Sequence, residues 1–163
     1  MLATGRIDDA RANELIAELL FLDAEDATRP IRMHVNSAGG GLTSGLAVYD
    51  TIRHVRSPVA TICLGEAGGV SALILAAGAK GQRSASPGAR IRLSLGAESV
   101  EGSVGEVLVR SKELEGLLER LARALAQHTG RHFEEVEHDL HHDRALSADE
   151  ARAYGIIDEV LSR

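Results

Sequence analysis

Two glycine-rich segments, each placed directly after an apolar run, are the first parts of this chain that could support chemistry. NSAGGG (36–41) follows IRMHV (31–35), and GEAGG (65–69) follows VATICL (59–64). If each apolar run is a strand and each glycine segment a tight turn into a helix, the exposed backbone N–H groups there can bind an anion or an oxyanion. Glycine also permits tight turns without any ligand, so one segment alone is weak evidence. Two in consecutive strand–helix units favour a shared site.

The second glycine segment has the layout of a hydrolase turn but lacks the expected side chain. In many hydrolases a strand–turn–helix lifts a nucleophilic serine above the sheet. Here the apex holds glycines, and the nearby serine, Ser71, comes two residues later than the apex at Gly69. We expect its hydroxyl to point elsewhere, and no neighbouring base is evident. The residues alone leave two readings open, a catalytic turn that has lost its nucleophile and a structural turn that never had one.

A histidine-rich stretch near residue 140 is the other candidate for chemistry. His138 and His142 are spaced i,i+4, which suits a metal on one helix face. His132 and His141 flank them, but no third ligand follows at a convincing spacing. We interpret the stretch as a solvated helix face, and we expect no metal and no cofactor.

The composition indicates a single-domain protein of an ordinary soluble class. The 163 residues are 44% apolar, with a net charge of −6 and 2% aromatic residues. The negative charge and the scarcity of stacking side chains disfavour a nucleic-acid partner. No apolar run is long enough for a membrane span, and the N-terminus lacks the features of a signal peptide, so we expect a cytoplasmic location. The single cysteine, Cys63, is expected to be a buried apolar residue.

Hydrophobic periodicity and capping signals place the elements that would position these residues. Helices are expected at 8–23, 42–55, 70–77, 106–128 and 131–141, and a short one starting in the capping box SADE (147–150) and ending at Gly155. Strands are expected at 31–35, 59–64, 89–95 and 156–161, with an irregular segment at 96–105. Strands alternate with helices through the first half, so the predicted class is α/β. The helix at 106–128 is longer than a domain this small needs, which favours contact with a partner subunit.

Several segments, in order across nearly the whole chain, resemble the proteolytic subunit of the Clp protease (ClpP). They are FLDAED, VNSAGGGLTSGLAVYDTI, VATICLGEA, LAAGAKGQR, QHTG and DRALSADEARAYGIIDEVL. The resemblance implies a crotonase-like α/β fold of stacked strand–turn–helix units with a protruding long helix. It implies one domain over 1–163, with a head at 1–95 and 144–163 and a handle at about 96–143. It also implies rings of seven subunits, usually two rings stacked through the handle.

Active members of that family carry a Ser-His-Asp triad, and the resemblance places its three positions in this sequence. The nucleophile position is Gly69, which has no side chain to attack a carbonyl. The general-base position is Ser94, which cannot hold a proton at neutral pH. The acid is present as Asp143. The oxyanion donors implied are the backbone N–H groups of Gly40 and Val70, which survive the loss of side chains.

Surfaces used for assembly also depart from the family pattern. The family docks a hexameric AAA+ unfoldase in an apolar cleft, whose positions correspond here to Leu20, Arg32, His34, His54, Ile62, Leu64, Ser84 and Leu161. The Arg, His and Ser replacements make this docking doubtful, because a buried arginine costs several kcal/mol unless paired. The chain also begins near the first core strand, without the family's axial loops. An acidic–basic pair that usually links the two rings is replaced by His141 and His142, which predicts weak or pH-dependent contacts between rings.

These features predict a non-catalytic ClpP-like subunit, inactive on its own. It would form or join a ring with itself or a catalytic paralogue and modulate ATP-dependent protein degradation. Two alternatives remain open at this point. One is a ligand-binding crotonase-fold protein that takes a peptide or an acyl-thioester, and the other is a serine endopeptidase with a relocated nucleophile.

Overall fold

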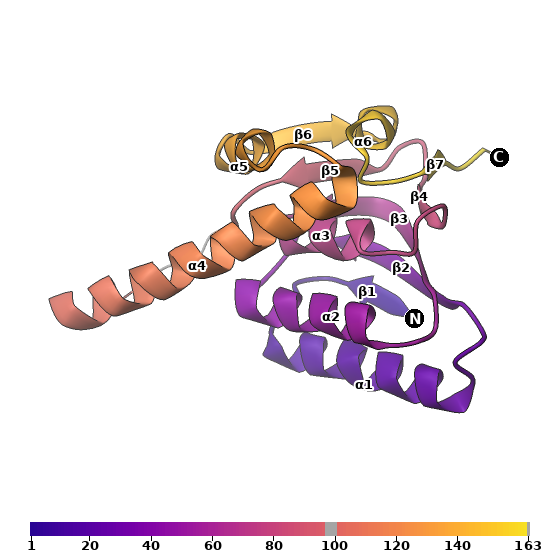
Figure 1. Ribbon diagram of the computed structural model, residues 1–163, viewed down its shortest axis with the longest axis horizontal. Helices are drawn as coiled ribbons and strands as arrows, with labels where there is room; N and C mark the ends of the chain where they lie inside the picture. Colours follow the sequence, from indigo (N-terminus) through magenta and orange to yellow (C-terminus); the bar gives the residue numbers. More distant parts are fainter. Residues whose placement is uncertain (97–100, 163) are drawn as a thin grey trace.

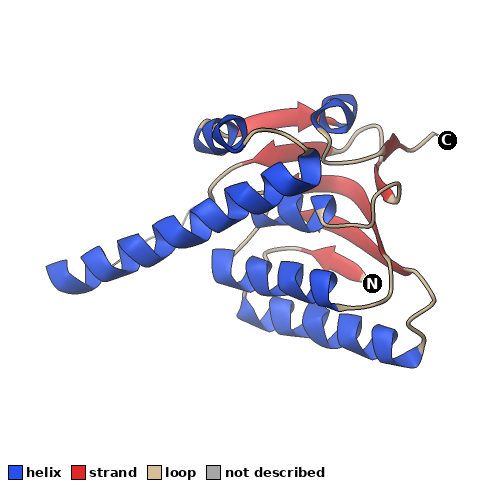
Figure 2. Cartoon of the chain, viewed as in Figure 1, coloured by secondary structure: helices blue, strands red, loops and turns tan. Residues whose placement is uncertain are grey.

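The computed structural model describes residues 1–96 and 101–162, and these form the predicted α/β architecture (Figures 1 and 2). The helices are α1 (Asp9–Glu25), α2 (Leu42–His54), α3 (Val70–Ala76), α4 (Val104–Thr129), α5 (Phe133–His141) and α6 (Ala148–Tyr154). The strands are β1 (Leu2–Thr4), β2 (Ile31–Ser37), β3 (Val59–Gly68), β4 (Arg83–Ala85), β5 (Arg90–Leu93), β6 (Arg144–Ser147) and β7 (Glu159–Val160).

One mostly parallel sheet carries the fold. Its strands lie in the order β1-β2-β3-β4-β7, all parallel, while β5 pairs in parallel with β3 and β6 pairs antiparallel with β5. Along β2 the buried residues alternate with more exposed ones, because successive side chains of a strand point to opposite faces. Helices α1 and α2 pack side by side on one face (Figure 2), and the other face carries exposed residues such as Arg32 and Leu64.

Local signals begin and end the helices close to where the sequence predicts them. The Asp8 carboxylate accepts from the Arg11 N–H at 2.9 Å and caps α1. Ser147 and Glu150 form the predicted capping box of α6, and Gly155 ends that helix in the left-handed region at φ 97°. A second capping box, Ser103 with Glu106, starts α4 two residues earlier than predicted. The predicted irregular segment 96–105 lies in part outside the described residues.

The largest error of the sequence analysis concerns the strand β3. A turn was predicted over 65–69, but residues 65–68 continue β3 to Gly68. The reason is long-range pairing. The first half of β3 pairs with β4, and Glu66–Gly68 then pairs with Arg90–Arg92 of β5. Glycine is needed here because two backbone segments approach closely. A Cβ at Gly68 would lie 2.6 Å from the Ala38 carbonyl oxygen.

Three short strands were not predicted, and the last predicted strand is shorter than expected. The strands β1, β4 and β6 have three or four residues each, too few to show a clear alternation. The closing strand predicted at 156–161 is limited to Glu159–Val160. The residues before it, Ile156 and Ile157, are buried in the core instead.

The core lies between the sheet and the helices, and α4 extends away from it. All seven residues of α3 are buried, as is Cys63 of β3. The carboxyl-terminal half of α4 enters this core through Leu121 and Leu125, while its amino-terminal half projects beyond the body of the molecule (Figure 1). Among the described helices none is both long and apolar enough to cross a bilayer. The division into head and handle stays a prediction.

Candidate functional site

Gly69 forms the sharp bend between β3 and α3. Its backbone has φ 50° and ψ −122°, a conformation that L residues rarely adopt. The Gly69 N–H donates to the Arg92 carbonyl at 3.0 Å, so β5 holds the bend in place. This bend is the strained strand-to-helix turn that a hydrolase uses to present a nucleophile. Here the position carries no side chain.

The position of residue 69 faces Ser94. A Cβ placed on Gly69 would lie 3.4 Å from the Ser94 carbonyl oxygen and 3.6 Å from its Oγ. The register explains this proximity, because Gly68 is paired with Arg92 and the chain continues along β5 towards Ser94. A side chain at 69 and one at 94 would therefore be direct neighbours. Gly69 has no side chain to attack a carbonyl, and a serine at 94 cannot act as the general base of a triad.

Asp143 and Ser94 line the same open pocket, which has a volume of about 720 Å³. Glycines of the first segment, Gly39 and Gly40, line it as well. The two glycine segments therefore meet, as the sequence analysis expected. Their backbones are in close contact, since a Cβ on Gly39 would lie 2.8 Å from the Gly68 carbonyl oxygen. Val70 is the first residue of α3, so its N–H has no acceptor within the helix.

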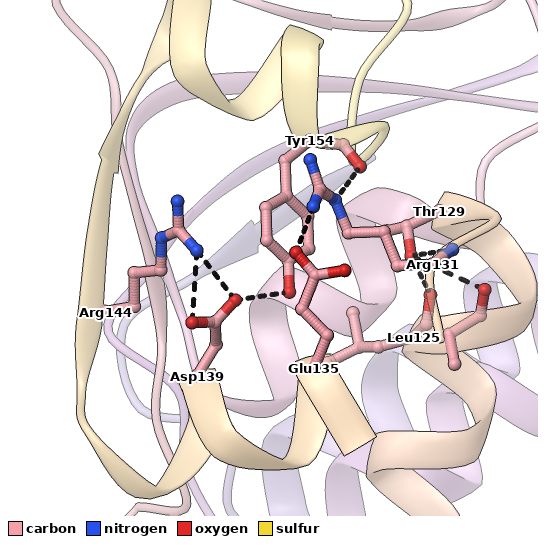
Figure 3. Close-up of polar contacts among 8 residues, drawn as sticks. Leu125, Thr129, Arg131, Glu135, Asp139, Arg144 and Tyr154 are labelled. Atoms are coloured by element: carbon pink, nitrogen blue, oxygen red, sulfur yellow. Dashed lines mark hydrogen bonds and ion pairs between the residues drawn. The ribbon is translucent and has the colours of Figure 1, made fainter. Parts of the chain in front are cut away.

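A polar network centred on the buried side chains of Asp139 and Tyr154 holds the segment that carries Asp143 (Figure 3). Asp139 of α5 accepts two hydrogen bonds from Arg144 of β6, at 2.9 and 3.1 Å, and one from the Tyr154 hydroxyl of α6 at 2.8 Å. Burial, followed by the hydrogen bond to Asp139, raises the pKa of Tyr154 well above its usual range. Asp143 lies between Asp139 and Arg144 in sequence and has a positive φ of 48°. The network therefore braces both sides of a strained residue.

The opposite side of Tyr154 is covered by Arg131. Its guanidinium lies 4.1 Å from the Tyr154 ring centroid and its Nε donates to the Tyr154 carbonyl at 3.1 Å. Arg131 also pairs with Glu135 one helical turn along α5. Figure 3 shows how these contacts tie α5 to α6 around one tyrosine ring.

Ser71 lies away from the pocket, inside the core. It is fully buried, and its hydroxyl donates to the Ser37 hydroxyl at 3.0 Å. Ser37 in turn accepts from the Gly39 N–H at 3.1 Å. Ser71 thus supports the first glycine segment from within the core. Among the residues that the structure describes, no histidine or lysine is hydrogen-bonded to it.

Only some of the residues predicted to line the partner-docking cleft lie next to one another in the structure. His34, Ile62 and Ser84 form one row across β2, β3 and β4, and all three are half-buried. Leu64 lies further along the same face of β3 and is 50% exposed. Arg32 precedes His34 on β2, and Leu161 follows β7, next to β4. Leu20 and His54 lie on α1 and α2 instead, and both are exposed.

The histidines of α5 lie at its carboxyl end. His141 is the last residue of the helix and His142 its cap, and both are exposed. The rings of His138 and His142 stack with centroids 4.0 Å apart, and the His142 Nδ1 lies 2.7 Å from the His138 carbonyl oxygen. Within the described ranges no group of three or more His, Cys, Asp and Glu side chains is arranged to hold a metal ion.

Sequence reasoning did not name five polar residues that line the pocket. They are Arg6, Asn36, Ser37, Glu66 and Arg92. The Asn36 side chain accepts from the Glu66 N–H at 3.2 Å and so bridges β2 and β3. The one available signal was alternation, because Arg90 and Arg92 are the exposed positions of β5. The pairing of β5 with the end of β3, which brings Arg92 to the pocket, was not visible in the sequence.

The fold and this site define an α/β protein whose strand-to-helix bend resembles a hydrolase turn and has glycine at its apex. The family model for Clp protease matches residues 1–163 of the chain. The chain therefore belongs to the Clp protease family. This confirms the family recognised from the sequence segments.

Proposed function

We propose that this protein is a non-catalytic subunit of a ring-shaped Clp peptidase assembly. It forms the ring alone or together with a catalytic paralogue, in rings of seven that stack in pairs, and it modulates ATP-dependent protein degradation. Membership of the Clp protease family supports assembly into rings in general terms. The crotonase-like character of the fold and the handle belong to the same proposal.

The observation that carries the proposal is the proximity of positions 69 and 94. A side chain at 69 would meet residue 94 at the pocket that Asp143 lines. This proximity supports a triad-like site in which the serine and histidine are replaced by Gly69 and Ser94 and the acid is Asp143. The backbone of the bend is retained, and only the reactive side chains are missing.

The buried position of Ser71 argues against a relocated nucleophile. A nucleophile must reach substrate and needs a base within hydrogen-bond distance. Ser71 has no solvent exposure and donates to another serine. We therefore expect the wild-type chain to hydrolyse a fluorogenic peptide no faster than buffer, and Ser71→Ala to behave identically.

Restoring the missing groups is the sharper test of the assignment. We predict that the Gly69→Ser/Ser94→His double variant gains measurable turnover of the fluorogenic peptide, because Asp143 and the bend are already present. The matched control adds Asp143→Asn to the double variant and should lower the rate by orders of magnitude, as loss of a triad acid does. Circular dichroism verifies that each variant is folded.

Two results would count against the proposal. Wild-type turnover that Ser71→Ala abolishes would make the chain an active peptidase with a relocated serine. A folded double variant with no turnover would show that residues 69 and 94 do not occupy the nucleophile and general-base positions. Assembly is tested separately by native mass spectrometry of the protein alone and of the protein mixed with a catalytic paralogue from the same cell. A monomer in both samples would overturn the proposal that this protein is a ring subunit.

A further inference from the structure

The pocket beside Gly69 contains two arginine side chains without a partner among the described residues. Arg6 follows β1 and Arg92 lies on β5, and both line the pocket of about 720 Å³. Within residues 1–96 and 101–162, neither guanidinium makes an ion pair or a hydrogen bond. Both residues are exposed. Arginine presents a planar fork of donors that matches a carboxylate in two parallel hydrogen bonds.

Backbone donors and an amide lie in the same pocket. The segment Ala38–Gly40 lines it, and the bend at Gly69 adjoins it through Ser94. Concave turns of this kind capture the carboxylate at the end of a peptide. The Asn36 oxygen is occupied by the Glu66 N–H, which leaves the Asn36 NH₂ group as a further donor towards the pocket.

The missing nucleophile changes which ligand such a pocket favours. In a working peptidase the donors stabilise an oxyanion formed in the middle of a chain, and serine attack drives the cycle onward. Without that attack, the species whose charge suits the donors is the product of hydrolysis, a peptide with a free carboxylate at the cleaved end.

We propose that this pocket binds the free C-terminal carboxylate of short peptides, held by Arg6 and Arg92 with the backbone N–H of Gly40. The inference rests on the proposed function, because a catalytic partner subunit would generate such peptides. The ligand class is a carboxylate-ended peptide, and the role of the site is to retain product within the assembly.

The pocket also contains two carboxylates, which orient the ligand. Glu66 and Asp143 line it, and both are exposed. They repel an anion placed against them, so the proposed peptide carboxylate contacts the arginines and not Glu66 or Asp143. The variant Glu66→Gln removes one of these negative charges and should therefore tighten binding of the peptide carboxylate.

Fluorescence polarisation with one peptide in two forms tests the proposal. The probe is an Ala-Ala-Leu tripeptide carrying fluorescein at its N-terminus, prepared with a free C-terminal carboxylate and as its C-terminal amide. We expect the acid to bind the full-length chain at least about tenfold more tightly than the amide, because a charge-assisted hydrogen bond is worth about one order of magnitude or more. Arg92→Met and Arg6→Gln should each remove most of that difference.

The control variant is Arg152→Ala, which deletes an arginine on α6 outside the pocket. It should leave the ratio of acid to amide affinity unchanged. Equal affinity of the two peptides, no binding of either at millimolar concentration, or a preference unaffected by both arginine variants would each overturn the inference. None of these results bears on ring assembly, which native mass spectrometry reports independently, so the two proposals fail separately.

Discussion

The imidazole of His128 is a single side chain whose surroundings hold it neutral. It lies near the carboxyl end of α4, with Nε2 3.3 Å from the Tyr49 hydroxyl and its ring edge-on to the tyrosine ring. Burial, and then the positive charges of Arg53 and Arg83, lower the pKa of His128 from 6.5 to about 4. The unfolded chain therefore takes up a proton at pH values where the folded chain does not.

This difference predicts a pH-dependent stability. Because the folded pKa is depressed, the contribution of His128 is fully present above about pH 6.5 and is lost as the pH falls towards about 4. Urea unfolding at several pH values should show a falling free energy of unfolding across this window, with a shallower slope in His128→Gln. An unchanged slope in that variant would contradict the assignment. His138→Gln, at an exposed position on α5, is the control.

At the scale of elements, one guanidinium ties together the ends of three helices. Arg83 of β4 is 5% exposed, and its Nη1 donates to the carbonyls of Ala76, His128 and Gly155 at 3.0 to 3.3 Å. These carbonyls lie at the carboxyl ends of α3, α4 and α6, which carry partial negative charge. Asp158 completes the cluster with bonds of 2.9 and 2.6 Å to Nε and Nη2.

We predict that Arg83→Met is the most damaging of the single substitutions considered. It removes the guanidinium that pairs with Asp158, which then keeps only backbone N–H donors, and it takes the donor from three carbonyls. Breaking a buried pair costs about 3–5 kcal/mol. Thermal and urea unfolding measure the loss. The comparison variant, Arg152→Met, removes an exposed pair with Asp149 and should cost no more than about 1 kcal/mol. Similar losses in both variants would show that the Arg83 cluster contributes little.

At the scale of the whole molecule, the projecting half of α4 leaves apolar surface uncovered. Val104, Leu108 and Val109 are 81%, 67% and 60% exposed. Large apolar side chains grouped on one projecting element mark surfaces that contact another protein. In the proposed assembly this half of α4 meets another subunit.

We predict that Leu108→Glu weakens self-association or association with a paralogue by about tenfold or more, as expected for a buried interface side chain. The free energy of unfolding should stay within about 0.5 kcal/mol of wild type, because Leu108 is exposed in the single chain. Sedimentation velocity over a dilution series measures the association. Arg110→Glu, about 200° away around the helix, is the matched control. Equal association of the wild type and Leu108→Glu would exclude this surface as the contact.

The sequence by itself determined the helices and the family. Capping residues and periodicity set the ends of the helices, since these signals act within a few residues of one another, as Ser147, Glu150 and Gly155 do for α6. The ordered segments from FLDAED to DRALSADEARAYGIIDEVL indicated the family that the matching family model shows.

Only the tertiary structure decided how distant residues meet. The extension of β3 through Gly68 depends on β5, a partner that starts 22 residues later in the chain, at Arg90. The same pairing brings Ser94 against Gly69 and Arg92 to the pocket, and the burial of Arg83 depends on Asp158 far along the sequence. Local patterns carry no information about such pairings, because their free energy arises from contacts between elements. GEAGG therefore looked like a turn, whereas it is the end of a strand followed by one bend at Gly69.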